Sequence, residues 1–230
     1  MAPGFVAILE GRMTKRTYLL FLLFLCFLAV AAGAGRRKKT ASSEAGKFDY
    51  YVLSLSWAPN YCAGHPADKS SECQPGGHVG FVLHGLWPQF NAGRPPLSCG
   101  PTSPVAAETV RHMLEYFPDR GLIQHEWTTH GSCSGLAAQD YFGKMEQAFK
   151  AVKVPDQYRT LDQTQKFPSK QLEKAFADAN HAPANAFRVS CFSGALVNME
   201  VCMSKDLQYQ ACTQSVHECS SSQLLMRAVR

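Results

Sequence analysis

Eight cysteines that follow an apolar N-terminal segment limit most strongly what this chain can fold into. The chain of 230 residues has nine cysteines, and one of them, Cys26, lies inside the apolar run at 18–34. The other eight are Cys62, Cys73, Cys99, Cys133, Cys191, Cys202, Cys212 and Cys219. An even number in an exported chain predicts a disulfide framework. Because eight cysteines allow about 105 pairings, spacing alone fixes none of them. The chain contains no Cys-x-x-Cys pair, which argues against structural zinc.

The N-terminal segment has the pattern of a secretory signal peptide. Lys15 and Arg16 precede the apolar run, which ends in the small residues Ala32, Gly33 and Ala34. An uncleaved anchor helix is the alternative, but the run is a little shorter than the ~20 residues of a membrane-spanning helix. We therefore expect residues 1–34 to be removed. The mature protein would be secreted or periplasmic, with no stable membrane association.

The charge distribution does not favour a general nucleic-acid binder. Residues 35–47 form a polar lead-in, expected to be flexible, that carries a basic run at 36–39. From Thr40 onward the chain has 16 basic and 17 acidic residues, a net charge of −1. Any affinity of the domain at 48–230 for a polyanion must come from local contacts. The length and the hydrophobic content of 46% suit a single globular domain.

Periodicity predicts strands near both ends of this domain and helices between them. Apolar and polar residues alternate over 48–57, and a strand at 79–84 is expected to end at His84 and turn over 85–88. Residues 60–77 and 91–104 are expected to be loops. Helices are predicted at 106–117, 139–152 and 169–180, with Ser169 as an N-cap, and further strands at 187–192 and 195–203. This order indicates an α+β fold, an antiparallel sheet packed with helices and stapled by disulfides.

Catalytic residue types gather in two segments, FVLHGLWPQ at 81–89 and HEWTTHGSC at 125–133. If the second segment is helical, a rotation of about 100° per residue places His125, Glu126 and His130 on one face and Trp127 on the other. Glu126 and His130 are then i,i+4 neighbours, and their contact would favour a charged imidazole.

A zinc hydrolase is the first interpretation to weigh for the second segment. The zinc motif His-Glu-x-x-His needs its histidines at i,i+4, whereas His125 and His130 stand at i,i+5. The extra residue turns the second ring by about 100°, which argues against a metal site. Histidines on separate elements instead suit phosphodiester transfer, in which one accepts a proton and the other donates one.

The two segments resemble the two active-site segments of the ribonuclease T2 family. His-Gly-Leu-Trp-Pro followed by His-Glu-Trp-x-x-His-Gly-x-Cys is a specific combination, and the likeness extends over most of 48–219. The absence of an Asn-x-Ser/Thr sequon slightly favours a bacterial source.

The resemblance implies a role for each matching residue. His130 would be the general base for the ribose 2′-OH and His84 the general acid for the 5′-oxygen. His125 would bind the phosphate, Glu126 would polarise it or position His130, and Trp87 would stack near a base. The enzyme would be an endoribonuclease that acts on single-stranded RNA, not on DNA, as a monomer. It would leave 2′,3′-cyclic phosphate ends and need no metal or other cofactor.

The resemblance also implies a disulfide pairing and exposes one departure. The implied bridges are Cys62–Cys73, Cys99–Cys133, Cys191–Cys219 and Cys202–Cys212. The family often has a lysine immediately before the second histidine of the 125–133 segment, but here that residue is Thr129. A hydroxyl carries no charge, so we expect a slower enzyme. The alternative is a weakly active or inactive relative that binds RNA or a protein.

Overall fold

The computed structural model describes residues 44–213, 216 and 218–229. The chain divides into two units at 1–40 and 41–230, and the described residues all belong to the second unit. The predicted signal peptide at 1–34 and most of the predicted lead-in at 35–47 lie outside the described residues. Within the described part of the chain, no helix is long and apolar enough to cross a membrane.

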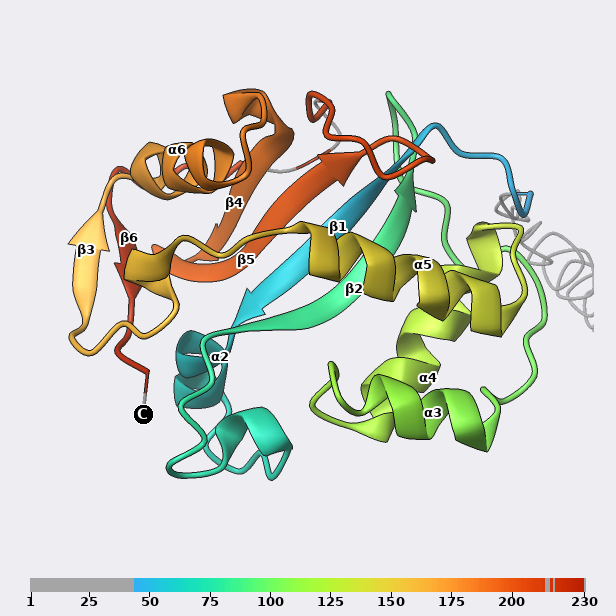
Figure 1. Cartoon of the computed structure of the whole chain (residues 1–230), viewed down its shortest axis with the longest axis horizontal. Helices are drawn as coiled ribbons and strands as arrows, with labels where there is room; N and C mark the ends of the chain where they lie inside the picture. Colours follow the sequence, from blue (N-terminus) through green and yellow to red (C-terminus); the bar gives the residue numbers. More distant parts are fainter. Residues whose placement is uncertain (1–43, 214–215, 217, 230) are drawn as a thin grey trace, which may run out of the picture. The chain divides into compact units, whose positions relative to one another are not determined.

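A six-stranded sheet forms the centre of the described unit (Figure 1). Its main strands are β1 (Tyr50–Trp57), β2 (Phe81–Gln89), β4 (Phe187–Phe192) and β5 (Ala195–Met203). The short strands β3 (Gln165–Phe167) and β6 (Leu224–Met226) complete it in the order β2-β1-β5-β6-β3, with β4 also paired to β5. All pairs are antiparallel except β5–β6, which meet in parallel at Ala195 and Leu225. The predicted α+β class is confirmed, with a mixed sheet.

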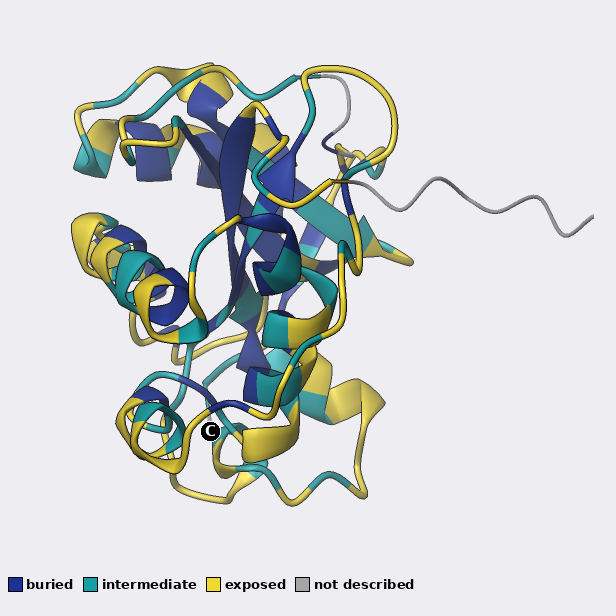
Figure 2. Ribbon diagram, turned by 90° about the vertical axis from the view of Figure 1, so that its right-hand side faces the viewer, coloured by how far each residue is buried: buried dark blue, intermediate teal, exposed yellow. Residues whose placement is uncertain are grey.

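The two longest helices of the described chain pack on one face of this sheet. The helices are α2 (Ala58–Gly64), α3 (Ala107–Met113), α4 (Arg120–Thr129), α5 (Ala138–Ala151) and α6 (Ser169–Ala179), with short 3-10 turns at η1 (Ser71–Cys73), η2 (Gly131–Cys133), η3 (Asp156–Tyr158) and η4 (Ala184–Ala186). Leu53 and Leu55 of β1 share one core with Met145 of α5 and Phe176 of α6. Buried residues therefore gather in the sheet and along the inward sides of the helices (Figure 2).

The face of β1 opposite Leu53 and Leu55 becomes more polar toward the C-terminal end of the strand. Tyr50 and Val52 pack in a small cluster with Cys202, whereas Ser54 and Ser56 follow them on the same face. This face carries the candidate site described below, and the alternation expected for residues 48–57 is confirmed.

Four local expectations were wrong. The helix expected at 106–117 ends at Met113, and turns follow it. β2 does not turn after His84 but continues to Gln89, because it pairs with β1 from Trp57↔Phe81 to Tyr50↔Gln89. Pro88 is tolerated there because β2 is an edge strand. The expected loop at 60–77 contains α2 and η1, since Pro59 occupies the first turn of a helix instead of only ending a strand. Ser169 is the first residue of α6, not its N-cap, which is Pro168.

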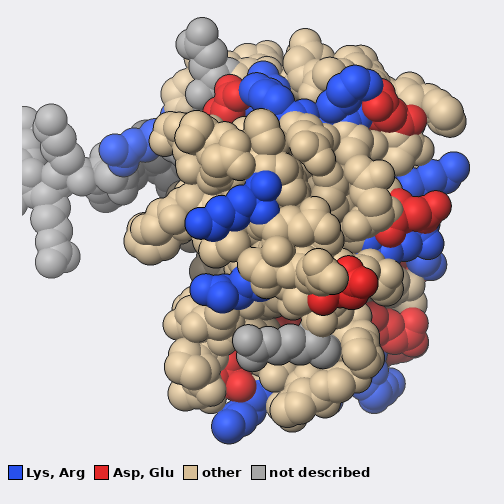
Figure 3. Space-filling model, turned by 90° about the vertical axis from the view of Figure 1, so that its left-hand side faces the viewer, with Lys and Arg blue, Asp and Glu red and all other residues tan. Residues whose placement is uncertain are grey.

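The described surface carries mixed charges. On the face shown in Figure 3, basic and acidic side chains are interspersed among uncharged ones. Several are paired locally, as Lys174 Nζ is with Asp178 Oδ2 at 2.6 Å and Arg159 Nε with Asp156 Oδ1 at 3.3 Å.

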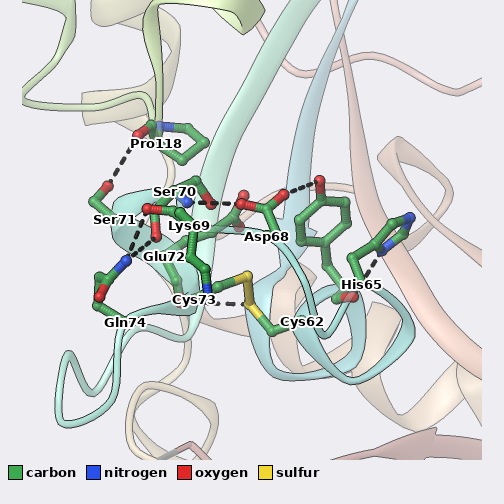
Figure 4. Close-up of a disulfide and its surroundings, with 11 residues drawn as sticks. Cys62, His65, Asp68, Lys69, Ser70, Ser71, Glu72, Cys73, Gln74 and Pro118 are labelled. Atoms are coloured by element: carbon green, nitrogen blue, oxygen red, sulfur yellow. Dashed lines mark hydrogen bonds between the residues drawn. A yellow bond between two sulfur atoms is a disulfide. The ribbon is translucent and has the colours of Figure 1, made fainter.

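All four implied disulfides are present: Cys62–Cys73, Cys99–Cys133, Cys191–Cys219 and Cys202–Cys212. Cys62–Cys73 joins α2 to η1 in a region where Ser71 Oγ also donates to the carbonyl of Pro118 (Figure 4). Cys99–Cys133 joins the loop after β2 to the turn that follows α4. The second bridge therefore anchors the segment that carries three of the expected site residues.

Candidate active site

His84 reaches the site from an irregular position in β2. Ser54 pairs with Gly85 but Leu55 pairs with Leu83, so the register shifts and His84 is left as the extra residue. A bulge of this kind re-aims a side chain. Its imidazole Nδ1 lies 2.9 Å from Ser56 Oγ, and Nε2 lies 3.9 Å from Glu126 Oε1. Burial lowers the pKa of His84, the neighbouring His125 lowers it further, and the polar side chain of Asn198 opposes both.

The second catalytic segment is helical only as far as Thr129. The Asp119 side chain caps α4 by accepting from the Leu122 N–H at 3.0 Å. His130 is the C-cap residue, and η2 follows it. Trp127 points toward the core and packs on Tyr141, as expected. A Cβ at Gly131 would overlap the Trp127 ring, so only glycine allows this sharp exit from the helix.

Glu126 is the fully buried carboxyl of the site. Its Oε2 accepts from Trp87 Nε1 at 2.8 Å, and its Oε1 is buried with no hydrogen-bond partner among the described residues. Burial raises its pKa to about 8, although the Trp87 hydrogen bond works against this. A Cβ at Gly85 would overlap the carboxylate, which explains the glycine after His84. Glu126 is thus a neutral carboxylic acid at acidic pH.

The expected contact between Glu126 and His130 was wrong. The Glu126 carboxyl is bonded to Trp87 instead, because the Trp87 indole from β2 reaches across to α4. His130 is consequently not charged by a carboxylate. Burial lowers the pKa of His130 to about 3, with smaller contributions from the positive charges of His125 and His84. The neutral ring can accept a proton, and its Nδ1 is buried with no hydrogen-bond partner among the described residues.

Trp87 lies between the two catalytic candidates. Its ring stacks on His130 with centroids 5.2 Å apart and meets His84 edge-on at 5.4 Å. Through its ring and its Nε1–H, Trp87 therefore contacts three of the expected site residues at once. Its expected stacking on a base stays a prediction.

His125 is the exposed member of the group. Its Nδ1 lies 3.5 Å from Thr129 Oγ1, one turn further along α4, and its ring is edge-on to His130 at 6.3 Å. The exposed imidazole, next to the buried Glu126, is accessible to a ligand from solvent.

The argument against a metal site from the i,i+5 spacing was wrong in its geometry. Ligand atoms of His125, Glu126 and His130 lie within 4.8 Å of one another. His130 keeps the last helical hydrogen bond of α4, from its N–H to the Glu126 carbonyl at 3.0 Å, so the ligand atoms approach through their side chains and not through a change in the helix. These residues are the ones that could hold a metal ion. A carboxyl with a raised pKa is a poor ligand, however, because metal ligands must be deprotonated.

Sequence reasoning missed two residues beside His84. Ser56 of β1 bonds to the His84 ring, and Asn198 of β5 accepts from Ser56. The available signal was the pair of serines, Ser54 and Ser56, at the end of an otherwise apolar strand.

Comparison with known protein families identifies the family of this chain. The model of the Ribonuclease T2 family matches residues 48–212. The chain belongs to the ribonuclease T2 family. The expected family is confirmed, and the match covers both catalytic segments.

Curated relatives agree with this family. A ribonuclease of Aeromonas hydrophila is 45% identical over 101 residues, which cover 44% of this chain and 45% of that protein. A probable ribonuclease of Haemophilus influenzae is 34% identical over 148 residues, 57% of this chain and 54% of that protein. The chain therefore spans about half the length of these two relatives.

Solved T2-type structures share the fold. An RNase-related protein from Calystegia sepium has a TM-score of 0.65 at 22% identity, covering 80% of this chain and 98% of that one. Trichomaglin, an S-like ribonuclease, has a TM-score of 0.62 at 21% identity, covering 80% of this chain and all of that one. At this level of identity the likeness establishes the fold alone.

Proposed function

We propose that this chain is an endoribonuclease that cleaves single-stranded RNA by transphosphorylation, with His130 as general base and His84 as general acid. The observation that carries this proposal is the placement of the two imidazoles, from separate elements, on either side of Trp87. Membership of the ribonuclease T2 family and the ribonuclease relatives support it.

His130 is suited to start the reaction. A general base must be unprotonated at the working pH, and a pKa of about 3 keeps this imidazole neutral above that value. It accepts the proton of the ribose 2′-OH while the 2′-oxygen attacks phosphorus. DNA has no such hydroxyl, which restricts the substrate to RNA.

His84 is suited to complete the reaction. As the P–O5′ bond breaks, a protonated His84 donates a proton from Nε2 to the leaving 5′-oxygen. The products are a 2′,3′-cyclic phosphate and a free 5′-hydroxyl. Because burial lowers the pKa of His84, this protonated form is populated in acid.

His125 and Glu126 are placed to stabilise the phosphate. A neutral Glu126 can donate a hydrogen bond from the buried Oε1, which is unbonded among the described residues. The exposed His125 ring can bind a phosphate oxygen. Donors fixed before the reaction stabilise developing negative charge without reorganisation. Both proton transfers use imidazoles, so the mechanism needs no metal-bound water.

The disulfides support a proposal for the compartment in which the enzyme acts. Four bridges form and persist in oxidising compartments. With the predicted signal peptide, they support a secreted or periplasmic enzyme. We further propose that it acts as a monomer.

Digestion of yeast RNA in EDTA tests the proposal. We expect cleavage that leaves 2′,3′-cyclic phosphate ends and is lost in His84→Ala and in His130→Ala. His65→Ala is the matched control, because His65 is exposed and its Nδ1 bonds only to the Tyr61 carbonyl outside the site. Cleavage that EDTA abolishes would overturn the metal-independent mechanism and point to the His125, Glu126 and His130 cluster.

A weakly active or inactive relative is the second candidate, and Thr129 is the observation that favours it. The last residue of α4 puts a hydroxyl, not an ammonium, beside His125. Retention of RNA on the intact protein without any cleavage would support this alternative.

A further inference from the structure

Three strands of the sheet place Asn198, Ser56 and the candidate general acid His84 in a row. Ser56 of β1 is paired directly with Asn198 of β5 on one side and with Val82 of β2 on the other. His84 lies two residues beyond Val82, and its side chain turns toward Ser56. Asn198 is only 8% exposed, so its amide group is shielded from water.

The hydrogen bonds in this row have one consistent direction. Ser56 Oγ donates to Asn198 Oδ1 at 3.1 Å and lies 2.9 Å from His84 Nδ1. A carbonyl oxygen can only accept, so the single hydroxyl proton of Ser56 is committed to Asn198. Ser56 Oγ must then accept from His84, and Nδ1 must carry a proton.

We propose that Ser56 and Asn198 are positioning residues that hold His84 in its Nδ1–H form and so make Nε2 the atom that delivers the catalytic proton. The inference rests on the proposed function only for the role of that proton. The tautomer itself follows from the hydrogen bonds.

The surroundings of Nε2 fit this assignment. Nε2 is directed toward the site, 3.9 Å from Glu126 Oε1, whereas Nδ1 is directed into the sheet. Because Ser56 Oγ accepts from Nδ1–H in both the charged and the neutral ring, this bond survives the transfer of the Nε2 proton. No donor or acceptor beside Nδ1 has to reorganise during the reaction.

The hydrogen bonds of this row also affect the protonation of His84. A hydrogen bond from Nδ1 is stronger when the ring is charged, so it favours the imidazolium against burial. The charged or titratable groups that face His84 are Glu126 and His125 of α4 and His130 at the end of α4. The two histidines repel a charged His84, and a neutral Glu126 gives it little help.

Nitrogen NMR of the histidine rings tests the tautomer without reference to activity. At about pH 7.5 the ring is neutral, and ¹⁵N shifts distinguish the protonated nitrogen from the one with a lone pair. His84→Gln assigns the signals. We expect Nδ1–H in the natural protein and in Ser56→Thr, which keeps the hydroxyl. In Ser56→Ala we expect a mixture of the two tautomers.

Ser54→Ala is the matched control for this experiment. Ser54 lies on the same strand and face, is fully buried, and its hydroxyl has no hydrogen-bond partner among the described residues. Its removal should leave the His84 signals unchanged. An Nε2–H tautomer in the natural protein, or identical signals in Ser56→Ala and Ser54→Ala, would overturn the proposal.

Steady-state kinetics then distinguish a positioning role of Ser56 and Asn198 from a purely structural one. Ser56→Ala should lower kcat about tenfold with KM changed less than about twofold, and Ser56→Thr should restore kcat. The basic limb of the kcat/KM profile should move to lower pH in Ser56→Ala and in Asn198→Leu, but to higher pH in Asn198→Asp, whose charge favours the imidazolium. Limbs that stay in place in all three variants would contradict the proposal.

The two proposals can fail separately. If His84→Ala keeps full activity, His84 is not the general acid and the proposed function fails. The NMR comparison of the natural protein with Ser56→Ala still tests whether Ser56 sets the tautomer of His84. If His84→Ala is inactive but Ser56→Ala leaves the tautomer unchanged, the proposed function stands and this inference falls.

Discussion

Trp87 contacts the other residues of the site through both its ring and its Nε1 nitrogen. The ring contacts His84 and His130, and Nε1 donates to Glu126. Between a pKa of about 3 for His130 and about 8 for Glu126, both of these groups are neutral. The site thus holds both proposed proton-transfer groups, while Glu126 and His130 add no positive charge to it over this pH range.

Thr129→Lys should raise kcat, by about three- to tenfold, because an added ammonium beside His125 stabilises charge on the phosphate in the transition state. Initial rates on a dinucleotide substrate measure the effect. Thr128→Lys adds the same charge on the neighbouring residue, whose side chain faces Thr102 and Gln124. It should change kcat little. An equal gain in both variants, or none in Thr129→Lys, would count against the assigned role.

At the level of secondary structure, long periodic segments could be predicted and short or interrupted ones could not. α5 and α6 match their expected ranges within one residue, because each buries a continuous apolar side. β3 and β6 have only three residues each and take their strand geometry from pairing with each other. The extension of β2 beyond His84 depends on its register with β1, which no local pattern in 81–89 contains.

The composition of the site was predictable, but its contacts were not. His84, His125, Glu126, His130 and Trp87 come together in the structure as the two motifs led us to expect. The spacing argument failed because it placed side-chain directions only, whereas the ligand atoms at the ends of His125, Glu126 and His130 still come within 4.8 Å of one another. Ser56 and Asn198 join the site through strand pairing, which a single sequence does not reveal.

Removal of the Cys99–Cys133 bridge should affect both stability and activity. The bridge closes a loop with a separation of 34 residues, and Cys133 follows His130 by three residues. In the chain-entropy model, Cys99→Ala with Cys133→Ala costs about 4 kcal/mol of unfolding free energy. We also expect kcat to fall at temperatures where the variant is still folded, because η2 no longer fixes His130. Urea unfolding and rate assays on one preparation measure both effects.

Cys62→Ala with Cys73→Ala is the comparison for this prediction. That bridge closes a loop with a separation of 11 residues between α2 and η1, and η1 contacts Pro118 before the start of α4, not the His130 end of that helix. It should cost about 3 kcal/mol and leave kcat of the folded protein unchanged. Equal losses of kcat in the two double variants would contradict the anchoring role of Cys99–Cys133.

The whole molecule contains buried carboxyls that make its stability depend on pH. Burial raises the pKa of Glu200 and of Glu72 to about 7, and that of Glu126 to about 8. A folded-state pKa above the unfolded value favours the protonated native form. The resulting stability is fully present below the unfolded pKa of 4.5 and is lost as the pH rises through the folded pKa. These groups favour an enzyme that is stable in acid.

Glu200→Gln should therefore raise the melting temperature more at pH 9 than at pH 4. The amide has the shape of the protonated acid but never ionises. The variant therefore keeps the folding stability that the natural protein loses between pH 4.5 and about 7. Thermal unfolding at the two pH values measures the difference. A melting temperature that changes equally at both would contradict the raised pKa.

Glu146→Gln provides a control of opposite sign. Hydrogen bonds from Lys150, His112 and Tyr116 lower the pKa of Glu146 to about 2. Its stabilisation is present above the unfolded pKa of 4.5 and is lost as the pH falls through about 2. This variant should therefore be less stable than the natural protein at pH 7, and the difference should vanish near pH 2.

The pH dependence of kcat/KM on a dinucleotide substrate in EDTA tests the acid–base pair most directly. For a neutral base and a protonated acid in the free enzyme, the profile is bell-shaped. We predict an acid limb at about 3, the pKa of His130, and a basic limb below 6.5, the ordinary value that burial lowers for His84. An optimum above pH 7, or a profile without a basic limb, would contradict the assignment of His130 and His84.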